Sequence, residues 1–211
     1  MIESQLQIQG FENRVIPCTL VEPDNANSHL TIILPGAGYN CYRPLLYYAT
    51  EDMLTKGSRV LQVHTDYTRQ EKYMTQFKNR DAVALETWAR EDAHRISRFL
   101  KDNFDNQMTI MGKSIGTFAM TEIVPEYKFQ NLLWLTPSLR GQWNMLANLG
   151  SNSHVVIGTK DQFYADAEPF LQRQALVIKD ADHALEIPGN PGASIETLGS
   201  VIEFIERNVS I

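Results

Sequence analysis

Short apolar runs recur along the chain, and segments of helical length separate them. The runs cover residues 30–34, 60–63, 108–111, 132–135, 155–157 and 176–178. Continuous apolar runs of this length are typical of strands that are buried on both faces, and their alternation with helices indicates a mostly parallel sheet. The pattern therefore predicts an α/β fold, with a doubly wound sheet and helices on both of its faces.

The first part of the chain has a different pattern. Residues 6–23 alternate apolar and polar positions around a polar bend, which predicts an antiparallel hairpin before the parallel sheet. Pro17 predicts that the second strand of this hairpin lies at a sheet edge, because proline has no backbone N–H to donate.

Two segments carry apolar residues at helical spacing, which predicts helices that each bury one face in the core. These residues are Leu85, Ala89, Ala93, Ile96 and Leu100 in the first segment, and Ile195, Leu198, Ile202 and Ile205 in the second.

Length and composition suit one globular domain over residues 1–211, without a separate cap domain. The net charge of −6 and the lack of a Lys/Arg run argue against general binding of nucleic acid or an anionic membrane. The N-terminal segment does not have the pattern of a signal peptide, and no run reaches the roughly 20 apolar residues that span a bilayer. Two cysteines, Cys18 and Cys41, are too few for a disulfide framework, so a cytoplasmic location is expected.

The stretch TIMGKSIGTF, residues 109–118, contains both GKS and the pattern G-x-S-x-G. GKS closes a phosphate-binding loop only when a glycine lies five residues before it, and Gln107 occupies that position. The second pattern is the nucleophile elbow, in which a serine follows a strand and begins a helix. The apolar run before Gly112 and the helical segment that stops at Pro125 provide this context, so Ser114 is the candidate nucleophile.

A serine nucleophile needs a histidine to accept its proton, and the chain has five histidines. His29 and His94 are predicted to be solvent-exposed, and His154 at the start of a strand is predicted to be structural. His64 ends one strand, and His183 lies in the loop after the last apolar run. Both of these therefore lie at the carboxyl edge of the sheet, where active sites form.

A carboxylate must fix the tautomer of that histidine. Asp161 follows a strand directly and gives the chain order Ser114, Asp161, His183, which is the order of α/β hydrolases. Asp166, Asp180 and Asp182 are rivals, although the last two are so close to His183 in sequence that they can hardly reach its ring.

An oxyanion hole needs two backbone amides near the nucleophile. The segment ILPGAGYN follows the strand at 30–34, and its glycines Gly36 and Gly38 allow the backbone to approach a reacting carbonyl. The amides of Ala37 and Ile115 are therefore the candidate donors, with an ordinary glycine turn as the alternative.

With these motifs the chain resembles a compact member of the α/β-hydrolase superfamily over nearly its whole length. The resemblance rests on the PGAG loop, the GKSIG elbow, the GTKD acid loop and the DADHALE histidine loop. It implies serine chemistry and does not specify a substrate. Pro35 is a departure, since many esterases have a histidine at this position of the oxyanion loop.

Only residues 138–153 separate the end of one strand, at residues 135–137, from the start of the next at His154, which leaves room for one helix and no cap domain. The site is therefore expected to be open and shallow. Candidate substrate-binding residues are Gly38, Tyr39, Lys113 and Trp143, although Trp143 could equally pack the helix on the sheet. The polar connection 66–80, with Tyr67, Tyr73 and Phe77, is expected to border the site as a small flap.

These residues predict a serine hydrolase that cleaves small soluble carboxylic esters through an acyl-enzyme intermediate. No cofactor or metal is expected, and the expected partner is a small-molecule ester, with no nucleic acid and no membrane. The alternatives are a thioesterase or small peptidase with the same triad, or a non-catalytic binding protein on the same fold. The sequence does not indicate an oligomeric state.

Overall fold

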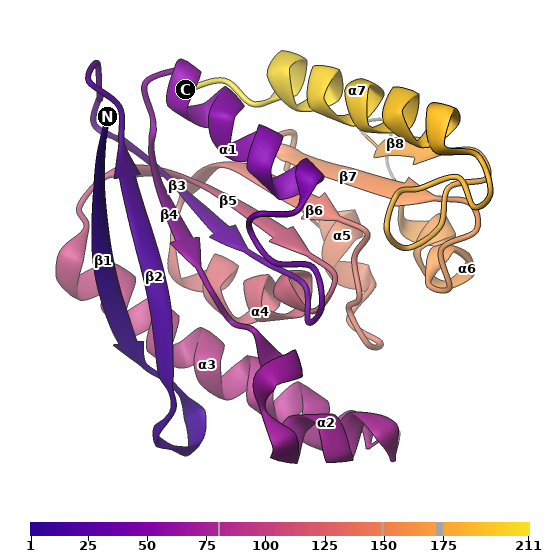
Figure 1. Cartoon of the computed structure of the whole chain (residues 1–211), viewed down its shortest axis with the longest axis horizontal. Helices are drawn as coiled ribbons and strands as arrows, with labels where there is room; N and C mark the ends of the chain where they lie inside the picture. Colours follow the sequence, from indigo (N-terminus) through magenta and orange to yellow (C-terminus); the bar gives the residue numbers. More distant parts are fainter. Residues whose placement is uncertain (80, 149, 172–174) are drawn as a thin grey trace.

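The computed structural model of the protein describes residues 1–79, 81–148, 150–171 and 175–211. An eight-stranded sheet with the order β1-β2-β4-β3-β5-β6-β7-β8 forms its centre (Figure 1). The strands are β1 (Ile2–Gln9), β2 (Val15–Glu22), β3 (His29–Leu34), β4 (Arg59–Val63), β5 (Gln107–Lys113), β6 (Phe129–Leu135), β7 (Ser153–Gly158) and β8 (Ala175–Ile178). β1 and β2 pair antiparallel with their neighbours, and all other pairs are parallel. The predicted mostly parallel sheet with an N-terminal antiparallel hairpin is confirmed.

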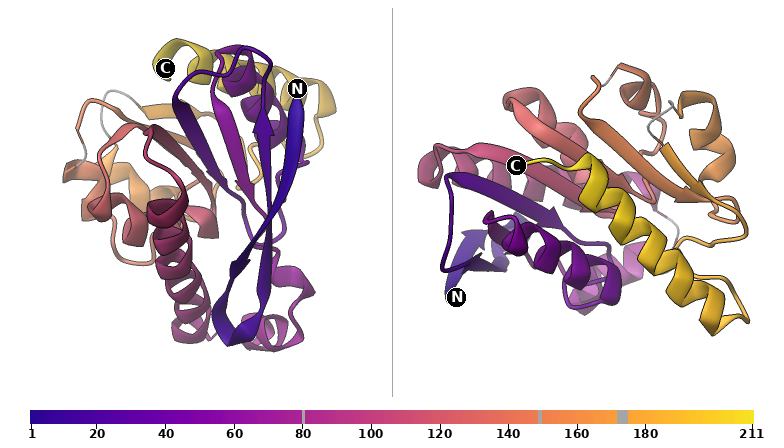
Figure 2. Two further views of the ribbon diagram at one scale, coloured as in Figure 1. Left: turned by 90° about the vertical axis from the view of Figure 1, so that its left-hand side faces the viewer. Right: turned by 90° about the horizontal axis from the view of Figure 1, so that it is seen from above.

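The helices are α1 (Pro44–Thr55), α2 (Glu71–Lys78), α3 (Ala82–Asn103), α4 (Ile115–Ile123), α5 (Asn144–Asn148), α6 (Tyr164–Ala167) and α7 (Pro191–Asn208). Helices α1 to α6 fill the segments between the parallel strands, as the alternating pattern predicts, and α7 follows the last strand. Short 3₁₀ turns cover Phe11–Asn13, Tyr67–Arg69, Val124–Glu126 and Glu168–Phe170. α1 and α7 lie side by side, and α3 and α4 form a second pair (Figures 1 and 2).

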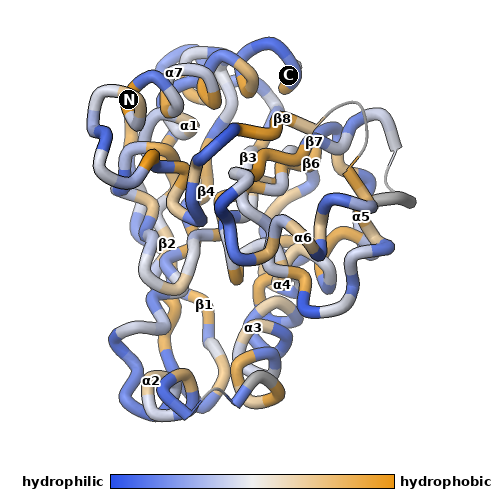
Figure 3. The backbone as a smooth tube through the Cα atoms, turned by 90° about the vertical axis from the view of Figure 1, so that its right-hand side faces the viewer, coloured by the Kyte–Doolittle hydropathy of each residue, from blue (hydrophilic) through white to orange (hydrophobic). Residues whose placement is uncertain are grey.

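Successive residues of the central strands belong to two different core clusters, because side chains alternate across a strand. Ile32 packs in a cluster with residues of α3 and α4, whereas its neighbour Ile33 packs in a cluster with residues of α1 and α7. In Figure 3 the tube is mostly orange, that is hydrophobic, along β6, β7 and β8, whereas the region of α2 is largely blue, that is hydrophilic. This packing makes the central sheet a rigid support for the loops at its carboxyl edge.

The prediction that Pro17 places β2 at a sheet edge is wrong, because β2 lies between β1 and β4. The register between β2 and β4 begins only at Cys18, opposite Val63, so Pro17 falls one residue before the ladder. Its carbonyl instead accepts a hydrogen bond from the amide of His64 at 2.9 Å. The missing N–H of the proline therefore removes no bond between the two strands.

Two predictions about exposure are also wrong. His29 is only 2 % exposed, because β3 is a central strand, and its Nε2 lies 3.0 Å from Oγ1 of Thr109 on the neighbouring β5. Ile195 is 71 % exposed, and the fully buried positions of α7 are Thr197, Val201 and Ile205. The other predicted stripe, on α3, is buried throughout.

Candidate active site

The candidate residues follow four parallel strands, and each emerges where its strand ends. The PGAG segment follows β3, Ser114 follows β5, Asp161 follows β7 and His183 follows β8. Because the carboxyl ends of parallel strands meet at one edge of the sheet, these loops converge there.

Ser114 has backbone angles of φ 55° and ψ −122°, between the last residue of β5 and the first residue of α4. This is an unfavourable conformation for a residue with a Cβ atom, and it is characteristic of a sharp strand-to-helix turn. The turn is possible because α4 packs very closely on β3: a Cβ atom at Gly116 would overlap the backbone of Leu34 and Pro35. The second glycine of the GKSIG motif therefore allows the close packing that positions Ser114.

The side chains of Ser114, His183 and Asp161 form a continuous hydrogen-bonded chain. Oγ of Ser114 lies 2.8 Å from Nε2 of His183, and Nδ1 of His183 lies 2.8 Å from Oδ2 of Asp161. The carboxylate is buried, and its other oxygen accepts a hydrogen bond from the amide of Phe163 at 2.9 Å. This arrangement orients the ring so that Nε2 faces the serine hydroxyl.

The rival carboxylates lie elsewhere. Asp182 accepts hydrogen bonds from the amides of Ala184 and Glu186, at 2.8 and 3.1 Å, and so shapes the loop of His183. Asp180 forms an ion pair with Lys160, and Asp166 is exposed on α6. The structure brings only Asp161 of the four to the histidine ring.

The two residues whose amides are the candidate oxyanion donors line the same cavity as Ser114. Ala37 and Ile115 both line it, and neither amide donates a hydrogen bond to another residue in the described part of the chain. A Cβ atom at Gly36 would lie 3.3 Å from the Cβ of Ser114, so a glycine at this position allows the loop to approach the serine. Both amides are therefore without an acceptor in the described part of the chain.

Lys113, directly before the serine, is only 1 % exposed. Its ammonium group donates a hydrogen bond to Oγ1 of Thr136 and another, of 2.6 Å, to the carbonyl oxygen of His183. It also lies 5.1 Å from the centroid of the Tyr39 ring. Burial lowers the pKa of Lys113 to about 8, although the charges of nearby carboxylates, Asp161 first among them, oppose the shift. The cation therefore connects the elbow to the histidine loop, which the sequence does not reveal.

The cavity at Ser114 has a volume of about 460 Å³. Of the candidate substrate-binding residues, Gly38, Tyr39 and Lys113 line it, and so do Tyr73 and Phe77 of α2. Trp143 is not among its lining residues, and it packs in the core with its ring 6.3 Å from that of Phe163. This placement favours the packing role for Trp143 over the substrate-binding one.

The described part of the segment that borders the site, residues 66–79, is largely helical. It contains the turn Tyr67–Arg69 and helix α2, while Arg80, the last residue of the expected flap, lies outside the described residues. Tyr67 and Tyr73 are 2 % exposed and their rings stack at 4.9 Å, so both anchor this segment to the body of the protein. Phe77, at 51 % exposure, is the more accessible of the two aromatic residues of α2 that line the cavity.

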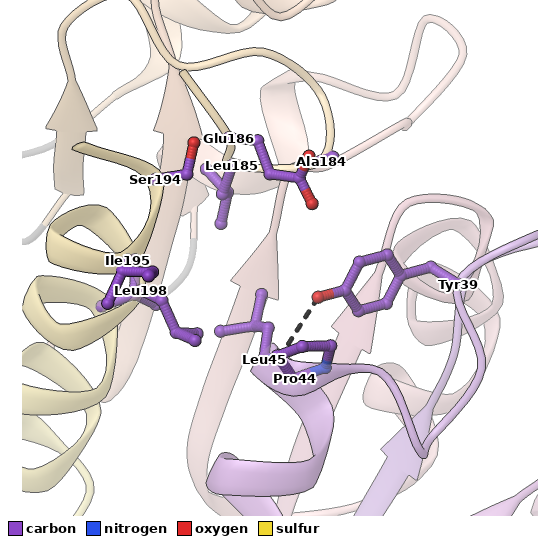
Figure 4. Close-up of a pocket in the computed structure, with 10 residues that line it drawn as sticks. Tyr39, Pro44, Leu45, Ala184, Leu185, Glu186, Ser194, Ile195 and Leu198 are labelled. Carbon is purple, nitrogen blue, oxygen red and sulfur yellow. Dashed lines mark hydrogen bonds between the residues drawn. The ribbon is translucent and has the colours of Figure 1, made fainter. Parts of the chain in front are cut away.

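A second, apolar cavity of about 150 Å³ lies between α1, the histidine loop and α7 (Figure 4). Leu45, Leu185 and Leu198 line it, and the hydroxyl of Tyr39 accepts a hydrogen bond from the amide of Leu45 at its border. Tyr39 lines both cavities. Ala184 also lines both, so the two cavities are neighbours at these residues.

Comparison with solved structures identifies the fold. A lidless α/β serine hydrolase from Xanthomonas campestris aligns with 99 % of this chain and 96 % of its own, with 13 % identity and a TM-score of 0.63. An α/β serine hydrolase homologue from Coxiella burnetii aligns with 100 % of this chain and 99 % of its own, with 14 % identity and a TM-score of 0.71. An esterase domain from Rhodothermus marinus covers 100 % of both chains, with 11 % identity and a TM-score of 0.61. The chain therefore has the α/β-hydrolase fold.

Comparisons of sequence add no closer relationship. No protein-family model matches the chain, and no curated protein matches it. None of the helices in the described part of the chain is long and apolar enough to cross a membrane.

Proposed function

We propose that the protein is a serine hydrolase that cleaves small soluble carboxylic esters through an acyl-enzyme intermediate. The observation that carries the proposal is the hydrogen-bonded chain from Ser114 through His183 to Asp161. Its support from the comparisons is the shared fold, which serine hydrolases and esterases have.

In the proposed reaction, Oγ of Ser114 attacks the carbonyl carbon of the ester while Nε2 of His183 accepts the hydroxyl proton. Asp161 accepts a hydrogen bond from Nδ1–H, which fixes the tautomer and stabilises the imidazolium ion. The amides of Ala37 and Ile115 donate hydrogen bonds to the oxyanion of the tetrahedral intermediate.

The intermediate collapses as the bond to the leaving oxygen breaks, and His183 gives its proton to the departing alcohol. Water then attacks the carbonyl carbon of the acyl-enzyme while His183 accepts its proton. The bond to Oγ of Ser114 breaks, His183 returns the proton to Oγ, and the carboxylic acid is released. Lys113 is a positioning residue in this scheme, because it holds the backbone carbonyl of His183 and does not contact the reacting atoms.

We also propose that the protein is a single lidless domain that acts on a small molecule in the cytoplasm. The short connection between β6 and β7, which contains the five-residue helix α5, supports the lidless part. The two cysteines, Cys18 and Cys41, are free and buried, which supports a reducing compartment.

Hydrolysis of p-nitrophenyl acetate by the wild type and by Ser114→Ala tests the proposal. We expect a rapid first turnover followed by a slower steady rate for the wild type, because the acyl-enzyme forms before water removes it. The variant should have no activity above background and a nearly unchanged Tm. Equal turnover by the two proteins would refute the role of Ser114.

A further inference from the structure

Arg140 lines the cavity of Ser114, and its charge is not neutralised. Within the described part of the chain its guanidinium group has no ion pair and donates no hydrogen bond, and its Nε atom is buried without a partner. A buried donor without an acceptor disfavours the folded state by about 1–3 kcal/mol, and more when the group is charged. The Nη atoms of Arg140 are not buried in this way, so an acceptor that enters the cavity can reach the guanidinium group through them.

The backbone at Arg140 indicates that this side chain is held in place at some energetic cost. Arg140 and Gly141 have φ angles of 46° and 90°, and the amide of Gln142 donates a 3.0 Å hydrogen bond to the carbonyl of Leu139. These features define a tight turn whose first central position, with positive φ, favours Gly, Asn or Asp. An arginine there adds strain that does not stabilise the fold, and strain of this kind is concentrated at functional sites.

The other charged groups that line the cavity already have partners. The ammonium group of Lys113 is bonded to Thr136 and to the His183 carbonyl, and the Asp182 carboxylate is bonded to two loop amides. The His183 ring lies between Ser114 and Asp161. Arg140 is therefore the charged group of this lining that remains available to a ligand.

The surroundings of Arg140 are aromatic. Tyr73 and Phe77 line the same cavity, with ring centroids 6.4 Å apart, and Phe163 lines it next to the His183 ring. Burial raises the pKa of Tyr73, and the charge of Arg140 opposes part of that rise, which places the guanidinium within electrostatic reach of the phenol. A ligand in this cavity would thus meet apolar ring surface together with one unpaired cation.

We propose that Arg140 binds a carboxylate of the substrate, so that the preferred substrates are esters that carry a free carboxylate at the end of a short apolar segment. The inference rests on the proposed serine hydrolase function and adds the class of substrate to it. A guanidinium group matches a carboxylate with two parallel N–H donors, and a planar acceptor of this kind satisfies the unpartnered donors of Arg140. The aromatic side chains would contact the apolar segment between the carboxylate and the ester.

The test uses matched pairs of esters that differ only in the charge at the far end. The p-nitrophenyl monoesters of adipic, pimelic and suberic acids are compared with their methyl esters, and the ratio of kcat/KM for acid over methyl ester is measured. We expect at least one wild-type ratio above 1, and Arg140→Gln should lower it about tenfold or more, the effect of one charge-assisted hydrogen bond. Arg43→Gln is the matched control, because Arg43 is exposed and does not line the cavity, and its ratio should equal that of the wild type.

A second measurement uses the wild type alone, in case Arg140→Gln does not fold. Hexanoate should inhibit hydrolysis of the methyl esters competitively, and hexanamide at the same concentration should inhibit at least tenfold more weakly. The carboxylate site would be overturned if the two compounds inhibit equally, or if Arg140→Gln leaves the ratio of kcat/KM for acid over methyl ester unchanged. In either case, hydrolysis of the methyl esters would still support the serine hydrolase function. Hydrolysis of neither ester by the wild type would instead overturn the proposed function, and the carboxylate site with it.

Discussion

Replacement of Lys113 by methionine tests how the fold positions the histidine. The side chain lengths are similar, but methionine removes the ammonium group that donates to the carbonyl of His183 at 2.6 Å. A hydrogen bond from a charged donor contributes about 1.5–3 kcal/mol, so its loss should lower kcat for p-nitrophenyl acetate by about 10- to 100-fold as the histidine loop loosens. Lys128→Met, at an exposed position, is the control and should leave kcat unchanged.

Lys113→Met should also change how the free energy of unfolding depends on pH. The pKa of Lys113 falls from 10.5 to about 8, and at about 1.4 kcal/mol per unit the fold disfavours the ammonium by about 3 kcal/mol relative to the neutral amine. Because the unfolded chain binds more protons than the native state between about pH 8 and 10.5, this lysine makes the free energy of unfolding rise with pH in that window. Replacement of a buried charge by an apolar side chain is often neutral or stabilising, so Lys113→Met should change the free energy of unfolding at pH 7 by less than about 2 kcal/mol.

Urea unfolding at pH values from 7 to 10.5 measures this effect. In the wild type, the free energy of unfolding should include a contribution that rises with pH in this range. Lys113→Met should lack this contribution, and Lys128→Met should retain it. Two results together would refute the argument that a buried cation connects the elbow to the histidine loop. The free energy of unfolding would have the same pH dependence in the wild type and in Lys113→Met, and the variant would have the kcat of the wild type.

Four further predictions follow from the same geometry. Asp161→Asn should lower kcat by up to about 10⁴, since an amide can stabilise the wrong histidine tautomer, and Asp166→Asn should have little effect in the same ester assay. Gly116→Ala should lower both Tm and kcat, because the added Cβ atom overlaps the β3 backbone that packs on α4; an unchanged Tm would contradict that overlap. Asp92→Ala should destabilise the protein by about 3–5 kcal/mol in urea unfolding, because it leaves the buried partner, Arg14, unpaired. Uncharged p-nitrophenyl esters should have their highest kcat/KM at two to four acyl carbons, and a maximum at eight or more would indicate a long acyl tunnel.

The fold and the arrangement of Ser114, Asp161 and His183 could be predicted because they depend on local patterns. Each of these residues lies directly after an apolar run, and the carboxyl ends of parallel strands meet at one edge, so order along the chain implies proximity in space. The glycines of the elbow are equally local signals, since they permit close packing that no other residue allows.

The remaining features depend on contacts between distant segments. A sequence contains no signal that the Lys113 side chain turns inward to a carbonyl 70 positions away, because long cationic side chains are usually exposed. The polar neighbours of His29 predict a position at the surface, yet its strand lies in the middle of the sheet. Arg140 does not belong to any sequence motif, and only the cavity that it lines together with Ser114 suggests a role for it.

The central claim is that Ser114 is a nucleophile activated by His183, and labelling with a fluorophosphonate probe tests it most directly. Such probes react much faster with an activated serine than with an ordinary hydroxyl group, and mass spectrometry of peptides locates the adduct. We predict a single adduct on the peptide that contains Ser114, no labelling of Ser114→Ala, greatly slowed labelling of His183→Ala, and wild-type labelling of Lys128→Met. No labelling of the folded wild type, or labelling that persists in Ser114→Ala, would contradict the account.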